Sequence, residues 1–185
     1  MQERLINEQI NKFLDLRIDK RILFLTKYPD AHERKDGFFQ RVLRVDLIFK
    51  DYLRIYLNVH GTKIQFNIIQ IDELCYQINL NLEMEISKEL LKFFALSVSM
   101  VYAHSIYSLT NWINQTLFAN AHNAIWDVHG VVPEEVAYLT PANTAFIQLT
   151  SDTELFAYSH SKLIIGVSNK LIQYLKQKYV SCKNN

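Results

Sequence analysis

The stretch from Ser87 to Phe118 constrains the fold most, because it carries almost no charge. After Lys92 the next charged residue is Asp127, and the next Lys or Arg is Lys162. A helix that is apolar nearly all round is normally buried in a core, in an oligomer interface or in a membrane. We therefore expect residues 87–130 to form a hub helix region against which the rest of the chain packs.

A membrane-spanning helix is the first alternative to a buried one. A span needs about 20 mostly apolar residues. The run from Phe93 to Leu109 is nearly that long, but it contains one His and four Ser, and Lys92 flanks only one end. Because these polar residues and the missing second anchor do not fit a span, we expect no membrane segment.

Composition favours one globular domain over residues 1–185. The chain is 49% hydrophobic, its formal net charge is +1, and it has only four Gly and three Pro. A near-neutral charge gives no reason to expect a nucleic-acid partner. Cys75 and Cys182 form no CxxC pair, and no apolar leader follows Met1, so we expect a reduced, cytoplasmic protein.

Apolar residues alternate with polar ones through much of residues 21–86, as in Leu53–Val59 and Tyr76–Ile86. The breaks between these runs are only about two residues long, and such short loops join antiparallel neighbours. A phase shift at Ile69 and Ile71 predicts a bulge. We therefore expect an α+β fold with an antiparallel β-meander of four to five strands. An N-terminal helix over residues 1–20 and C-terminal helices would cover one face of the sheet.

Helix-start signals mark residues 131–185 as a C-terminal helical region. Pro133-Glu134-Glu135 is typical of a first helical turn, where Pro fits and carboxylates are favoured. Thr140 before Pro141 is a second candidate start, and Ser151-x-x-Glu154 is a capping-box pattern.

No motif in the chain is specific for a reaction, and we predict no catalytic residue and no cofactor. His122 and His129 are seven residues apart, so a helix would place them on one face, with Asp127 nearby. Metal centres need three or four ligands in good geometry. We predict no metal centre, and leave open whether His122, Asp127 and His129 form one.

Three segments resemble the SecB-like export chaperones. They are Phe66–Ile78, and the pair Leu90–Ala95 with Tyr102–Thr110, so the resemblance covers roughly residues 21–118. In that family a four-stranded antiparallel sheet is followed by a long helix. The resemblance implies a multimeric holdase, which is a chaperone that binds extended apolar polypeptide segments without being an enzyme.

Three functions are compatible with these features. The first is an oligomeric, non-enzymatic binding protein whose partners are its own copies and unfolded or partner polypeptides. The second is a small-molecule-binding domain or hydrolase with a pocket between sheet and hub helix. The third is an interaction protein of a phage or mobile element. The candidate binding residues lie on the hub helix: Phe93, Leu96, Met100, Tyr102, His104 and Tyr107.

Overall fold

The computed structural model describes residues 20–60 and 66–180, and in them the chain has an α/β fold. The predicted antiparallel meander is wrong: among the described strands only one pair is antiparallel, and the others are parallel. The predicted helix over residues 1–20 lies almost wholly outside the described residues. The chain divides into two compact units, with the boundary after Ser99.

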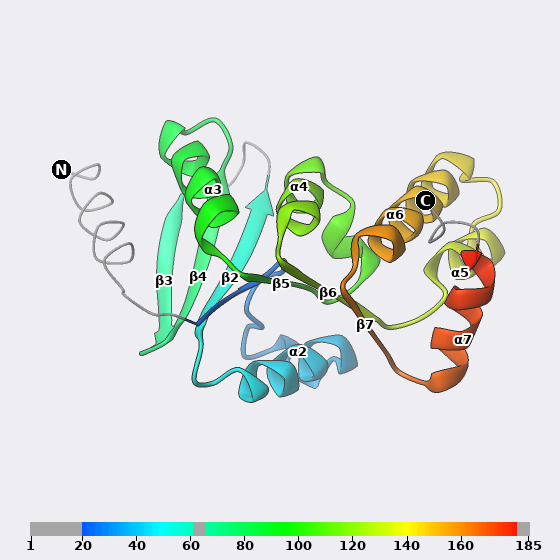
Figure 1. Ribbon diagram of the computed structural model, residues 1–185, viewed down its shortest axis with the longest axis horizontal. Helices are drawn as coiled ribbons and strands as arrows, with labels where there is room; N and C mark the ends of the chain where they lie inside the picture. The colour runs from blue at the N-terminus through cyan, green and yellow to red at the C-terminus, as the bar shows by residue number, and fades with distance from the viewer. Residues whose placement is uncertain (1–19, 61–65, 181–185) are drawn as a thin grey trace. The chain divides into compact units, whose positions relative to one another are not determined.

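The first unit contains a four-stranded sheet in the order β3-β4-β2-β1 (Figure 1). Its strands are β1 (Arg21–Phe24), β2 (Leu53–His60), β3 (Asn67–Asp72) and β4 (Cys75–Asn81). β1, β2 and β4 are parallel, and β3 pairs antiparallel with β4 across the two-residue turn Glu73-Leu74. The register shifts between Gln70 and Asp72, where the sequence predicts a bulge.

Helices lie on both faces of this sheet, and one of them connects a parallel pair of its strands. α2 (Gly37–Ile48) connects β1 to β2 on one side, and α3 (Glu85–Ser97) follows β4 on the other; the short helix η1 is Glu33–Lys35. Parallel neighbours need such crossover connections, and these bury both faces of the sheet. Leu53 to Leu57 are accordingly all buried, with no wet face.

The alternating segment around Leu43–Phe49 belongs to α2 and is not a strand. Asp36 caps this helix by accepting a hydrogen bond from the Phe38 amide. Val42 and Asp46, four residues apart, are the buried side chains of the helix. Leu47 is 67% exposed, and this exposed apolar residue completes the misleading period of two that runs through Leu43, Val45 and Phe49.

A buried charged network joins α2 to the sheet. The Arg54 side chain donates to Asp46 at 2.8 Å, and to both carboxylate oxygens of Asp72 at 2.8 and 2.6 Å. The Tyr56 hydroxyl also donates to Asp46, at 2.8 Å. Burial raises the pKa of the Asp46 carboxyl, while the bonds from Tyr56 and Arg54 oppose that rise.

The second unit has three parallel strands, β5 (Met100–Ala103), β6 (Asn123–Val128) and β7 (Leu163–Gly166), in that order. Helix α4 (Trp112–Asn120) connects β5 to β6 after the short helix η2 (Ile106–Leu109). Helices α5 (Val132–Leu139) and α6 (Thr144–His160) lead to β7, and α7 (Asn169–Lys178) follows it.

The hub helix predicted over residues 87–130 is therefore wrong. This segment forms most of α3, β5, η2, α4 and β6. Two side-chain caps interrupt residues 87–130. The Ser105 side chain accepts a hydrogen bond from the Tyr107 amide, and the Asn111 side chain accepts one from the Asn114 amide. Such caps compete with a continuous helix. The lack of charge in this segment reflects its burial as two strands and several short helices.

The C-terminal region is helical apart from β7. Pro133 lies in the first turn of α5, as predicted, with Glu134 and Glu135 beside it. The second helix does not begin at Thr140 or Ser151, because Asn143 caps α6 by accepting from the Phe146 amide. No helix among the described residues is long and apolar enough to cross a membrane.

The buried network predicts a large loss of stability on replacing Arg54 with Ala. Asp46 would keep its buried carboxylate without the guanidinium, and breaking a buried pair costs about 3–5 kcal/mol. Urea unfolding of Arg54→Ala and of the exposed control Arg44→Ala measures the difference. A loss for Arg54→Ala no larger than that for Arg44→Ala would contradict this role.

Candidate functional site

Three titratable side chains meet where β5 and β6 end. The two strands lie side by side and parallel, with Ala103 opposite Trp126 (Figure 1). The next residues, His104 and Asp127, therefore continue from neighbouring strands at the same edge, and His129 follows two positions after Asp127. In open α/β sheets, ligands bind beyond the carboxyl ends of the strands. We call His104, Asp127 and His129 the His–Asp–His cluster.

Asp127 is the centre of this cluster. Its Oδ2 accepts a hydrogen bond from the Tyr102 hydroxyl at 3.1 Å. The same oxygen lies 3.3 Å from Nε2 of His129 and 3.7 Å from Nδ1 of His104. The rings of Tyr102 and His104 are also in contact, with centroids 4.6 Å apart. One carboxylate oxygen thus faces a hydroxyl and two imidazoles.

The members of the cluster differ in how far solvent reaches their side chains. The side chains of His104 and Asp127 are fully buried, whereas that of His129 is 20% exposed. A buried carboxylate is costly unless hydrogen-bond donors or positive charge compensate for it. Here Tyr102 and the imidazoles do so, and His129 is the member of the cluster that solvent or a ligand can reach.

A second carboxylate lies beside the exposed end of the cluster. Gly130 follows His129, and a Cβ atom at this position would lie 2.7 Å from Oε1 of Glu135 on α5. The side chain of Glu135 therefore folds back over the Gly130 backbone. Burial raises the pKa of the Tyr107 hydroxyl, and the negative charge of Glu135 raises it further, which places Tyr107 near the same carboxylate.

The structure brings only part of the predicted site together. His104 belongs to the cluster, Tyr102 donates a hydrogen bond to its Asp127, and Tyr107 lies near Glu135. Phe93 and Leu96 are on α3 in the first unit, and Met100 begins β5 at its opposite end. His122 is also misplaced by the prediction, since it precedes β6 and His129 follows it.

Sequence reasoning missed that His104 is the partner of Asp127 and His129. The signal was present in Ala124-Ile-Trp-Asp-Val128, a short apolar run followed directly by His129-Gly130. Such a run is compatible with a buried strand ending in a loop. The prediction of a hub helix region over residues 87–130 hid this arrangement.

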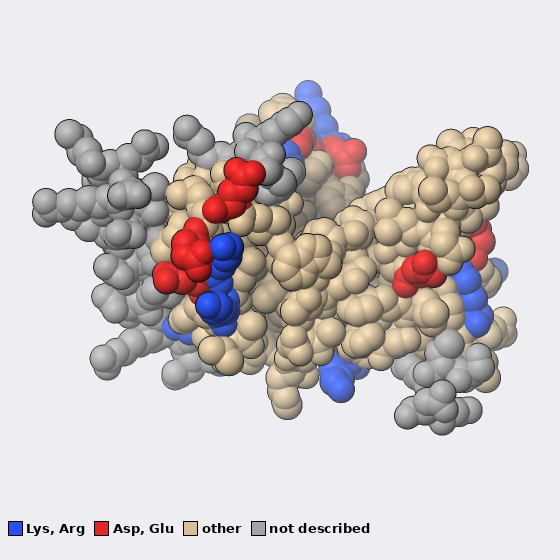
Figure 2. Space-filling view, turned by 90° about the horizontal axis from the view of Figure 1, so that it is seen from above, with Lys and Arg blue, Asp and Glu red and all other residues tan. Residues whose placement is uncertain are grey.

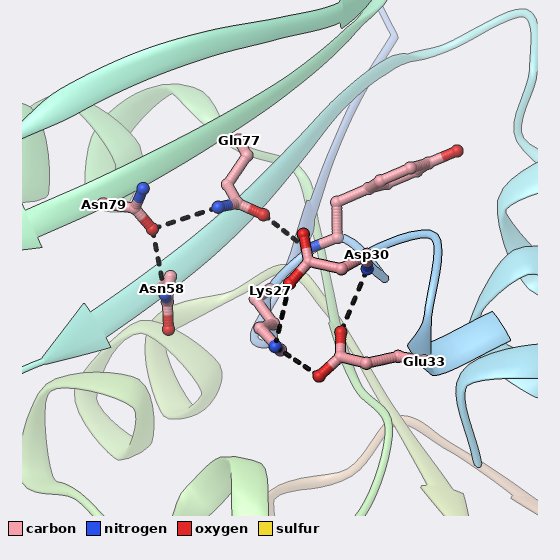
Figure 3. Close-up of polar contacts among 7 residues, drawn as sticks. Lys27, Asp30, Glu33, Asn58, Gln77 and Asn79 are labelled. Atoms are coloured by element: carbon pink, nitrogen blue, oxygen red, sulfur yellow. Dashed lines mark hydrogen bonds and ion pairs between the residues drawn. The ribbon is translucent and has the colours of Figure 1, made fainter. Parts of the chain in front are cut away.

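A different polar cluster holds the loop after β1 in the first unit. The Tyr28 amide donates to Gln77 at 2.7 Å, and Gln77 and Asn58 both donate to Oδ1 of Asn79, at 3.1 and 2.9 Å (Figure 3). In the same loop Lys27 contacts Glu33 at 2.5 Å and Asp30 at 3.4 Å. These bonds satisfy one another within the protein, so we assign them the role of fixing the loop on β4.

Comparison with known proteins adds no assignment. No family model matches the chain, and neither a curated protein nor a solved structure matches it. The SecB-like resemblance is neither supported nor refuted by these comparisons, although the antiparallel sheet that it implies is absent from the described residues.

The geometry predicts that Asp127 fixes the tautomer of His129. A carboxylate 3.3 Å from Nε2 favours a proton on that nitrogen and leaves Nδ1 as the acceptor of the neutral ring. In Asp127→Asn we expect the proton to redistribute between the two nitrogens, changing the ring ¹⁵N shifts of His129 in histidine-labelled protein. His122 is the internal control, and identical His129 shifts in both proteins would contradict the assignment.

Proposed function

We propose that the chain is the small-molecule-binding α/β domain of an enzyme, with His129 as the group that meets the ligand. The observation that carries this proposal is the contact of a part-exposed imidazole with a fully buried carboxylate at the ends of two parallel strands. This is the edge at which open α/β sheets bind ligands. The proposal corresponds to the second of the three functions that the sequence left open.

His129 has the environment of a general acid or base. A candidate base is recognised by a second group that orients it, and here Asp127 lies behind the ring. Tyr102 in turn donates to Asp127 and holds the carboxylate in place. An imidazole titrates closer to neutral pH than other side chains, so an oriented histidine can move a proton to or from a bound hydroxyl or amine.

The charges around the cluster indicate the chemistry of the ligand. Glu135 presents a carboxylate beside His129, and from Phe93 to Ser161 the sequence contains no Lys or Arg. Phosphate and carboxylate ligands are usually held by such cations. A neutral or cationic ligand with hydroxyl or amine donors suits Glu135 and His129 better, so we assign the site to that class.

Replacing His129 with Ala should abolish binding at this site without unfolding the domain, because the side chain is partly exposed. We would screen polyols, sugars, nucleosides and amines by thermal shift against the native protein. A compound that raises the melting temperature should lose its effect in His129→Ala and keep it in His122→Ala. Equal stabilisation of His129→Ala would place the binding site elsewhere.

Exposed apolar side chains support a second proposal, the oligomeric holdase. Trp112 is 71% exposed and Tyr138 is 86% exposed in the second unit, and Leu96 is 89% exposed in the first. Figure 2 shows Lys, Arg, Asp and Glu in small groups separated by wide uncharged areas. Exposed aromatic residues are typical of surfaces that bind polypeptides.

The holdase proposal predicts that the protein suppresses aggregation of a chemically denatured client diluted from guanidinium. Trp112→Ser should weaken this suppression at least severalfold, because it removes an exposed aromatic contact. Light scattering at equal protein concentrations measures the effect, and the exposed polar substitution Gln148→Ser is the control. Aggregation that is unaffected by the native protein would contradict a holdase function.

A further inference from the structure

The imidazole nitrogens of the His–Asp–His cluster lie farther from the Asp127 carboxylate than in tight ion pairs. The two nitrogens lie 3.3 and 3.7 Å from Oδ2 of Asp127, and one ligand atom of each residue lies within 4.8 Å of the others. Charge-assisted N–H···O bonds are shorter, at about 2.7–2.9 Å. The three groups therefore converge on one point without closing into tight ion pairs.

This spacing is close to that of ligands around a metal ion. Zinc binds nitrogen and carboxylate oxygen at about 2.0–2.2 Å in tetrahedral geometry, which separates two ligand atoms by about 3.3–3.6 Å. The separations of 3.3 and 3.7 Å bracket this range. The third separation, between the ligand atoms of the two imidazoles, is within 4.8 Å, and a shared ion would hold all three atoms at the tetrahedral separations.

The donor set indicates which ions would bind. Two imidazole nitrogens and one carboxylate oxygen suit zinc and other divalent first-row transition metals, whereas Mg²⁺ and Ca²⁺ prefer oxygen ligands. The Tyr102 hydroxyl, bonded to the Asp127 carboxylate, is the kind of outer partner that orients a metal ligand. The carboxylate of Glu135 beside Gly130 adds a negative charge near the cluster, which favours a cation.

We propose that His104, Asp127 and His129 bind a divalent transition-metal ion of the zinc class. Three protein ligands leave a fourth position for water or a substrate atom, as in catalytic zinc sites. His104 and Asp127 are fully buried and His129 is 20% exposed, so water or a substrate would reach the ion past His129. Nε2 of His129 binds the ion as an unprotonated nitrogen, so the single proton of the neutral ring then lies on Nδ1.

This inference goes beyond the proposed function, because an Asp-oriented histidine can bind a ligand without a metal. Its nearest alternative within the described residues is the group Asp30, His32 and Glu33, which could also offer ligand atoms. That group lies on the loop after β1, and Lys27 already contacts both of its carboxylates. It therefore serves as a comparison and not as a second site.

The test is a titration of the full chain, stripped with a chelator, with Co²⁺ and then with Zn²⁺. We expect one equivalent of Co²⁺ to give the visible absorption of a tetrahedral site and Zn²⁺ to displace it. His129→Ala should bind at least tenfold more weakly, and this part-exposed position should tolerate the change. His122→Ala and His32→Ala are the matched controls and should bind as the native protein does.

Three results would overturn the metal site. They are no tetrahedral Co²⁺ spectrum, equal affinity in His129→Ala, or an equal loss in His122→Ala, which would indicate adventitious surface binding. Circular dichroism of each variant confirms that it is folded, and Asp127→Asn gives a second, isosteric test. The titration uses no organic ligand. If no metal binds but a ligand still binds in a His129-dependent way, only the metal proposal is contradicted. If a metal binds but none of the screened compounds does, only the proposed function is contradicted.

Discussion

Parallel pairing of the strands is the constraint on which the rest of the structure depends. Strands that run in the same direction need crossover connections, and these connections cover the faces of the sheet with helices. In the second unit the same arrangement brings the carboxyl ends of β5 and β6 to one edge. His104 and Asp127 are far apart in sequence. They meet because His104 directly follows β5 and Asp127 is the next-to-last residue of β6.

Each unit also buries an aspartate side chain, and the two carboxylates have different kinds of partners. In the first unit, Asp46 is matched by the guanidinium of Arg54 and by the Tyr56 hydroxyl, all at hydrogen-bond distance. In the second, Asp127 faces one hydroxyl at 3.1 Å and two imidazoles at longer distances. Tight pairing suits a structural role, whereas a carboxylate with looser partners retains the capacity to bind a proton or an ion.

The sequence predicted local features better than the architecture. The first turn of α5 at Pro133, the short turn between β3 and β4 and the irregularity near Ile71 were predictable because each depends on adjacent residues. Parallel or antiparallel pairing depends on contacts between segments distant in the sequence, and α2 was hidden by its exposed Leu47, which continues the alternation. His104 was noticed as a candidate but not paired with Asp127, because that pairing requires the register of β5 and β6.

The most direct test of the central claim is a crystal structure of the full chain soaked with a library of small polar fragments. We expect a fragment to bind at the carboxyl ends of β5 and β6 and to form a hydrogen bond with His129. Oδ2 of Asp127 should remain about 3.3 Å from Nε2 of His129. Fragments that bind only elsewhere, with His129 turned away from Asp127, would contradict the assignment of this edge as the functional site.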